Sequence, residues 1–223
     1  MPTSPRKNPV VRFDTGHPHK KNESKEQGET MKLSGLARVI KDHMICNVFR
    51  IADSNEFYIG AGAGIYSMTG FPFPCCRDET AAMLGISDNT MEKIAYDEYE
   101  VAYKEALLGF DLRDAISEEE EVKELGIEIV SCGENLIPLV EEKRQTVGMI
   151  GKSTLVPIMA EINGNGYIKY YKRRRASGSE YYVVKNGMCV IAAIEPYRLS
   201  WTDECRLQSL VAMLAETNTE EMA

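Results

Sequence analysis

The chain has 223 residues, of which 43% are hydrophobic and 27% charged, enough for one medium domain or two small ones with an ordinary core. No apolar run approaches the roughly 20 residues of a membrane helix, no signal peptide opens the chain, and its six cysteines form no CxxC pair. This composition argues against a membrane protein, a disulfide framework and a zinc site, and it favours a cytoplasmic protein without a metal or other cofactor.

The net charge of −8 is distributed unevenly along the chain. Residues 97–124 hold eleven acids against three bases, whereas residues 151–175 hold six bases against one acid. Because the two signs are segregated, an acidic total does not exclude nucleic acid as a partner.

The N-terminal part is expected to be a leader followed by a helix and strands. Residues 1–30 are polar and without periodicity, which predicts a disordered leader or tail. The segment "EQGET" can be encoded by a purine-rich ribosome-binding site, so Met31 is expected to be the native start. In the first strand-rich part, 31–75, the pattern predicts a helix over 33–42 and a strand over 44–51. A returning strand is expected over 57–68 and an irregular stretch over 69–74.

The returning strand contains the stretch "FYIGAGAGIYSM", with glycines at 60, 62 and 64. A dinucleotide-binding fingerprint needs G-x-G-x-x-G before a helix, and Ile65 stands where the third glycine is required. We therefore expect a strand in which small residues let a bulky side chain or a neighbouring backbone approach closely, or permit a bulge.

Residues 76–126 are expected to be an acidic helical insertion. Asp78 and Ser87 are candidate N-caps, and Ser117 with Glu120 has the spacing of a capping box. These signals predict helices over 79–84, 88–108 and 118–125. The candidate residues for docking a basic partner are Glu118, Glu119, Glu120 and Glu121.

The first two of these helices could instead form a helix-turn-helix over 78–96, which would make the protein a DNA-binding regulator. The second helix would begin with Asp88 and contain Glu92, and such anionic residues repel phosphates. A helical hairpin that packs apolar residues into the core is the competing interpretation.

Residues 127–200 are expected to form an antiparallel sheet with one helix, and 201–216 a closing helix. The pattern predicts strands over 127–131, 136–141 and 146–150, followed by a short helix over 153–161. A hairpin is then expected over 166–194. Plain sequence shows no internal repeat.

The stretch "KYYKRRR" of the hairpin interleaves aromatic and basic residues. On a strand, Lys169, Arg173 and Arg175 share one face, and Lys172 and Arg174 share the other. These five residues are the candidates for nonspecific contacts with nucleic-acid phosphates. They could equally guard a sheet edge against aggregation or pair with the acidic helices.

No group of residues forms a recognisable catalytic pattern. Cys75 and Cys76 lie beside Arg77, which could lower a thiol pKa, but His43 is the single histidine outside the N-terminal tail. An enzyme is therefore not expected.

The order of features over 146–199 resembles the last module of bacterial DNA sliding clamps. A strand leads into a short helix, three antiparallel strands follow, and the last strand closes on a methionine-proline-x-arginine-leucine type of signature, with Glu195 in place of the usual apolar residue. The residues that match the signature are Pro196, Tyr197, Arg198 and Leu199. Residues 31–68 are loosely similar to the opening of such a module.

This resemblance implies a ring or part-ring whose inner helices face DNA, with Pro196–Leu199 lining a pocket for partner peptides. The chain has room for about two modules where clamps have three. It also continues into a helix that could cover the peptide pocket.

Together these observations predict a non-enzymatic α+β protein with a clamp-like core, bacterial or phage-borne, that acts as an accessory of DNA replication or recombination. Its partner would be DNA, or a basic protein docked on residues 97–124 as on an interaction or inhibitor module. Self-association into a homo-oligomer is left open. Both roles require the basic hairpin to lie apart from the acidic helices.

Overall fold

The computed structural model describes residues 32–104, 107–141, 146–164 and 166–200, together with Asp203, Cys205–Leu207 and Ser209. The helical elements are α1 (Leu33–His43), α2 (Arg77–Leu84), α3 (Asp88–Met91), α4 (Lys152–Leu155), the 3₁₀ helix η2 (Val156–Ile158) and α5 (Met159–Gly164). The strands are β1 (Ile45–Ile51), β2 (Phe57–Ala61), β3 (Gly64–Ser67), β4 (Ala95–Val101), β5 (Glu120–Glu124), β6 (Ile129–Ser131), β7 (Glu134–Glu141), β8 (Val147–Gly151), β9 (Ile168–Arg174), β10 (Glu180–Asn186) and β11 (Cys189–Ile194).

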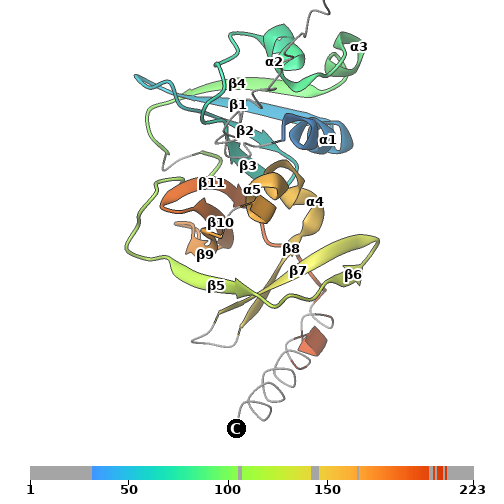
Figure 1. Ribbon diagram of the computed structural model, residues 1–223, viewed down its shortest axis with the longest axis vertical. Helices are drawn as coiled ribbons and strands as arrows, with labels where there is room; N and C mark the ends of the chain where they lie inside the picture. Colours follow the sequence, from blue (N-terminus) through green and yellow to red (C-terminus); the bar gives the residue numbers. More distant parts are fainter. Residues whose placement is uncertain are drawn as a thin grey trace, which may run out of the picture.

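All of these strands belong to one sheet. Its order is β4-β1-β2-β3-β11-β10-β9-β5-β7-β6, with β8 paired to β7 off this path. Every pairing is antiparallel except that of β1 with β4, which is parallel. Figure 1 shows β4 with α2 and α3 at one end of the molecule and the strands β5 to β8 at the other. The predicted α+β class with an antiparallel sheet is confirmed.

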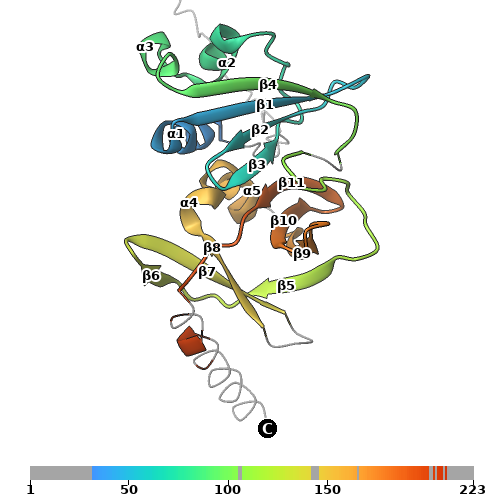
Figure 2. The ribbon, with the colours of Figure 1, turned by 180° about the vertical axis from the view of Figure 1, so that it is seen from behind.

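The centre of the sheet is built from one unit that occurs twice. In the first unit α1 leads into β1, β2 and β3, and in the second α4, η2 and α5 lead into β9, β10 and β11. The units meet where β3 pairs antiparallel with β11, Ile65 opposite Ala193. In both views α1 lies next to α4 on one side of the sheet (Figure 1 and Figure 2), and the Lys32 N–H donates to the Pro157 carbonyl at 2.9 Å. The arrangement approximates a two-fold axis between β3 and β11.

Alternating side chains divide the core into two layers because successive residues of a strand point to opposite faces. On the helical side, Tyr182 and Val184 of β10 pack in one cluster with apolar residues of α1, α4 and η2. On the other side, Tyr181 and Val183 pack with Phe110 and its neighbours, from the chain between β4 and β5. The sheet is therefore covered on both faces where the two units meet.

The glycine-rich stretch forms two strands, so the prediction of a single strand over 57–68 is wrong. Gly62 has φ +56°, in the left-handed region, and starts the tight turn between β2 and β3. The predicted close approach is confirmed. A Cβ on Gly62 would lie 2.6 Å from the His43 ring, and one on Gly64 would lie 2.6 Å from the Tyr66 hydroxyl.

The predicted acidic helices over 88–108 and 118–125 are also wrong. Of the described residues in 88–108, Asp88–Met91 form a single α-helical turn and Lys104 is in a 3₁₀ turn, whereas Ala95–Val101 forms β4 beside β1. Glu120–Glu124 forms β5, inserted between β9 and β7, with Val122 turned into the core. The capping-box spacing reflects only residues close in sequence. The edges of β1 and β9 offer backbone hydrogen bonds to an added strand, and this pairing outweighs the local preference for a helix.

The remaining expected elements are mostly present. The predicted helix over 33–42, the strand over 44–51, the irregular stretch over 69–74 and the strands after residue 127 are confirmed, and the helix over 153–161 is divided into α4, η2 and α5. Of the closing helix, Asp203, Cys205–Leu207 and Ser209 are helical; its other residues and the leader 1–30 lie outside the described residues. Within the described part of the chain, no helix is long and apolar enough to cross a membrane.

The predicted helix-turn-helix lacks its second helix. After α2 and the turn at Gly85, α3 spans a single turn of four residues. A recognition helix must be long enough to lie in the major groove, which one turn is not. The competing interpretation fits better, because Ala81, Leu84 and Ile86 pack into the core.

Candidate functional site

The five predicted phosphate-binding cations lie on β9 or directly after it, on both of its faces. Lys172 and Arg174 point to the side on which a pocket lies, whereas the Arg173 side chain is fully buried on the other side. The alternation expected for a strand is therefore confirmed. Each of the five forms an ion pair with a carboxylate.

Arg173 is held by the predicted docking residue Glu119. Its Nε and Nη2 donate to Glu119 Oε2 at 3.0 and 2.6 Å, and its Nη1 donates to the Asp111 carbonyl at 2.7 Å. The ammonium of Lys185, a residue that is only 5% exposed, binds the other oxygen of the same carboxylate at 2.5 Å. One carboxylate thus forms ion pairs with two buried cations and ties the segment before β5 to the sheet.

The other cations of the hairpin are paired as well. Lys169 binds Glu121 at 2.9 Å across the β5–β9 pairing, and Arg174 binds Glu180 at 3.0 Å. Arg175 pairs with Glu195 and lies over the Phe110 ring at 4.4 Å. The predicted separation of a basic hairpin from an acidic lobe is therefore wrong, because the pairing of β5 with β9 brings the two charges together.

Lys172 and Glu141 form a buried ion pair on the pocket side. Lys172 Nζ donates to Glu141 Oε2 at 2.5 Å, and the Thr146 hydroxyl donates to the same oxygen at 2.7 Å. Burial alone would raise the pKa of Glu141. Hydrogen bonds with Glu120, Lys172 and Thr146 and the lysine charge outweigh burial and lower the pKa from 4.5 to about 2. The Glu141 carboxylate is therefore ionised at neutral pH.

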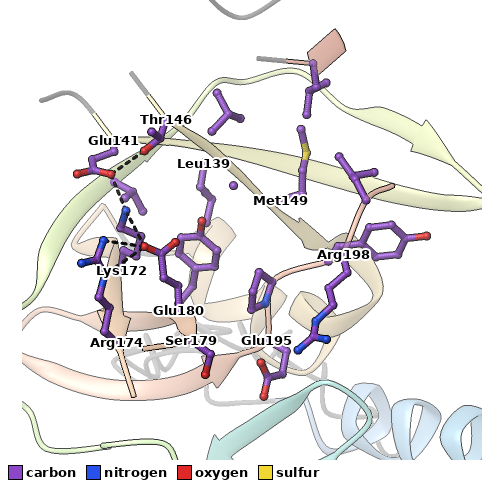
Figure 3. A pocket seen from close by; sticks show the side chains of 18 residues that line it. Leu139, Glu141, Thr146, Met149, Lys172, Arg174, Ser179, Glu180, Glu195 and Arg198 are labelled. Carbon is purple, nitrogen blue, oxygen red and sulfur yellow. Dashed lines mark hydrogen bonds and ion pairs between the residues drawn. The ribbon is translucent and has the colours of Figure 1, made fainter. Parts of the chain in front are cut away.

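A pocket of about 560 Å³ opens beside this pair (Figure 3). The β7–β8 hairpin forms one wall, β9 and β10 supply charged and aromatic side chains, and Glu195–Leu199 passes along another side. The labelled side chains of Figure 3 come from all of these elements and surround one space. The pocket combines apolar with ionic walls.

The predicted signature residues line this pocket. The Tyr197 N–H donates to the Met149 carbonyl at 2.7 Å, which fixes the segment to the edge of β8. Tyr197 and Leu199 pack against an apolar cluster that contains Met149 and Leu207. Leu207, a described residue of the closing helix, also lines the pocket.

Arg198 differs from the other cations of the pocket. It is exposed and forms no ion pair with any residue that the structure describes. Lys172, Arg174, Glu141 and Glu180 neutralise one another. Arg198 is therefore the charged side chain of the pocket lining that has no ion-pair partner among the described residues.

Gly148 of β8 gives the pocket its shape on the side of β10. A Cβ there would lie 1.5 Å from the Tyr182 hydroxyl oxygen, so only glycine lets the ring lie across the strand. Burial is the main cause that raises the pKa of Tyr182, and the nearby Glu180 and Glu141 charges add to it. The hydroxyl stays protonated and can donate or accept a hydrogen bond.

The structure thus brings together two predicted groups that the sequence kept apart: Lys172 and Arg174 of β9, and Pro196 to Leu199. It does not bring the glutamates 118–121 into a docking face. Glu118 is exposed. Glu119 and Glu121 form ion pairs with cations of β9, and Glu120 Oε2 lies 3.7 Å from Lys172 Nζ. Sequence reasoning missed Glu141 and Gly148, because an isolated glutamate or glycine in a strand carries no pattern of its own.

Comparison of the chain with protein-family models, with curated proteins and with solved structures finds no match. Among the described residues, no three histidine, cysteine or acidic side chains come together as metal ligands would.

Proposed function

We propose that this protein is a non-enzymatic protein-interaction module that binds a segment of a partner protein in the pocket beside Pro196–Leu199. The observation that carries the proposal is the pocket itself, which places the partly exposed segment Pro196–Leu199, an apolar cluster and the unpaired Arg198 around one space. Apolar walls with a few fixed polar groups are typical of sites that bind peptides and other ligands.

The charge state of the pocket supports binding over catalysis. Ion pairs and hydrogen bonds lower the pKa of Glu141, and burial raises that of Tyr182, so neither group exchanges a proton near neutral pH. General acid–base catalysis needs a group whose pKa lies close to the working pH. Groups held in one protonation state instead supply fixed charges and hydrogen bonds for recognition.

A capture experiment tests the proposal. The full chain, its Leu199→Asp variant and its Arg38→Glu variant would be used to capture proteins from cells that carry the gene. Leu199 lines the pocket, whereas Arg38 is an exposed residue of α1 outside its lining. A protein captured by the wild type and by Arg38→Glu, but lost with Leu199→Asp, is expected. Identical capture by all three folded proteins would refute the proposal.

A second candidate is the accessory role in DNA replication or recombination, with a clamp-like core. The duplicated unit favours it, because a helix followed by three antiparallel strands also builds the modules that residues 146–199 resemble. The candidate no longer relies on the β9 cations, since contact with phosphates would have to break the ion pairs of Lys172 and Arg173.

Retention on circular DNA tests this second role. A clamp-like ring or part-ring closed around DNA is expected to stay on a nicked circle in moderate salt and to leave it once the circle is cut. Equal retention on both DNA forms would point to ordinary electrostatic binding, and no retention would remove the role.

A further inference from the structure

We propose that the occupant of the pocket is an extended peptide segment that adds as a strand to the open edge of β8 and places an acidic side chain against Arg198. This inference rests on the proposed function and specifies the chemistry of the partner. It follows from the direction of the β8 backbone groups, from the two faces of the strand, and from the unpaired charge of Arg198.

The edge of β8 that faces away from β7 is only partly occupied. In an antiparallel pair, the N–H and C=O of one residue point to the same side, and successive residues alternate. The Met149 carbonyl accepts a hydrogen bond from the Tyr197 N–H, so the backbone N–H and C=O of Met149 point away from β7. Its partner in β7 is Pro138, which has no N–H to donate, in agreement with this direction.

The same alternation sets the direction of Val147. Val147 lies two residues before Met149, so its backbone N–H and C=O also point away from β7. Those of the intervening Gly148 point towards β7. Val147 and Met149 line the pocket. The Val147 N–H and C=O and the Met149 N–H are therefore directed to the pocket side, and an added strand would find three backbone hydrogen-bonding groups there.

The two faces of β8 predict which side chains of the added strand are apolar and which are polar. Val147 and Met149 contact the cluster that contains Leu199 and Leu207, so every second side chain of the peptide would pack there. The side chains in between would face Tyr182, across the small Gly148, and the paired charges beside it. The peptide is expected to alternate apolar with polar residues.

Charge complementarity supplies the acidic residue. Arg198 directly follows Tyr197, whose backbone N–H is hydrogen-bonded to β8. The Arg198 side chain therefore starts next to the open edge of β8. Since Arg198 is exposed and has no carboxylate partner among the described residues, a carboxylate on the peptide would pair with it. A guanidinium is well suited to such a bidentate pair.

A displayed library of random dodecamer peptides, selected on the immobilised full chain, is the probe. We expect selected peptides with an acidic residue and apolar residues at alternate positions. The peptide that binds best would then be synthesised and its Kd measured with each variant. No enrichment, or enrichment of basic peptides, would overturn the proposal.

Two pairs of variants separate the backbone from the charge. Val147→Pro removes the outward N–H, whereas Val147→Ala keeps it and loses only side-chain volume. We expect Val147→Pro to weaken binding at least tenfold and Val147→Ala less than threefold, with both proteins folded by circular dichroism. Arg198→Glu should also weaken binding at least tenfold and should select basic peptides instead, while Arg38→Glu should leave Kd unchanged.

Hydrogen exchange of the full chain distinguishes the other occupants. Binding of the peptide should slow exchange at Val147 and Met149 more than at Gly148, whose N–H is directed to β7. Slow exchange at these two amides in the free protein would show that the edge is already covered, by a second copy if it depends on concentration and by the chain's own C-terminal part if it does not. Either result overturns the proposal. Loss of partner capture with Leu199→Asp but not with Val147→Pro would also overturn it while leaving the proposed function intact.

Discussion

The carboxylate of Glu119 is expected to be the most sensitive single charge for stability. Glu119→Gln keeps the size of the side chain but removes the negative charge that pairs with both Arg173 and Lys185, which are 0% and 5% exposed. A buried cation left without its partner typically costs about 3–5 kcal/mol. Arg173 keeps its bond to the Asp111 carbonyl, and Lys185 keeps its position over the Tyr171 ring at 4.4 Å.

Because these remaining contacts compensate in part and the two effects are not additive, we expect a total loss of about 4 kcal/mol in the free energy of unfolding. That is a large fraction of the roughly 5–15 kcal/mol by which a domain is stable. Urea unfolding followed by circular dichroism measures the change. Glu118→Gln is the matched control, since its exposed side chain should change stability by less than about 0.5 kcal/mol.

A second substitution tests the cause. If the loss comes from uncompensated burial of charge, Arg173→Met should destabilise the Glu119→Gln protein much less than it destabilises the wild type. A loss below about 1 kcal/mol for Glu119→Gln, or simple additivity in the double variant, would refute the reasoning that this acidic segment serves the fold.

Three further predictions concern the sheet and the pocket. Gly148→Ala should lower the free energy of unfolding by about 1–3 kcal/mol, because the new methyl group meets the Tyr182 hydroxyl, whereas Gly166→Ala, with open space around it, should change it little. Folding lowers the pKa of Glu141 from 4.5 to about 2, so its ionised form stabilises the protein, and the free energy of unfolding should fall as pH drops from about 4.5 towards 2. Glu141→Gln should be less stable at neutral pH and should show a weaker pH dependence over this range. Tyr66→Phe should cost about 1 kcal/mol, because its buried hydroxyl donates to a backbone carbonyl of α4 at 2.7 Å; an unchanged urea midpoint would contradict that contact.

Local pattern was sufficient for much of the fold. The helical spacing of Leu36 and Ile40 predicted α1, and the alternation of β9 predicted which cations share a face. Glycines at 62 and 64 predicted close approach, and the structure supplies the His43 and Tyr66 side chains that approach them. These features depend on neighbours in sequence or on the size of one residue, so the sequence carries them directly.

The acidic part of the chain could not be predicted in the same way. Ser117 and Glu120 match a helix start, and the segment 95–101 continues a helical pattern, yet both regions are strands. Whether such a segment becomes helix or strand depends on whether a sheet edge is open beside it. That edge belongs to residues about 50 positions away, as the pairing of Glu120 with Lys172 shows.

By itself the sequence determined the α+β class, the order of most elements and the two faces of β9. Only the tertiary structure decided where the charges meet. Strand pairing placed β5 next to β9, so the glutamates that could have formed a free surface neutralise Lys169 and Arg173. The same long-range pairing set Pro196–Leu199 beside β8 and formed the pocket, because a site built from distant segments exists only after the chain has folded.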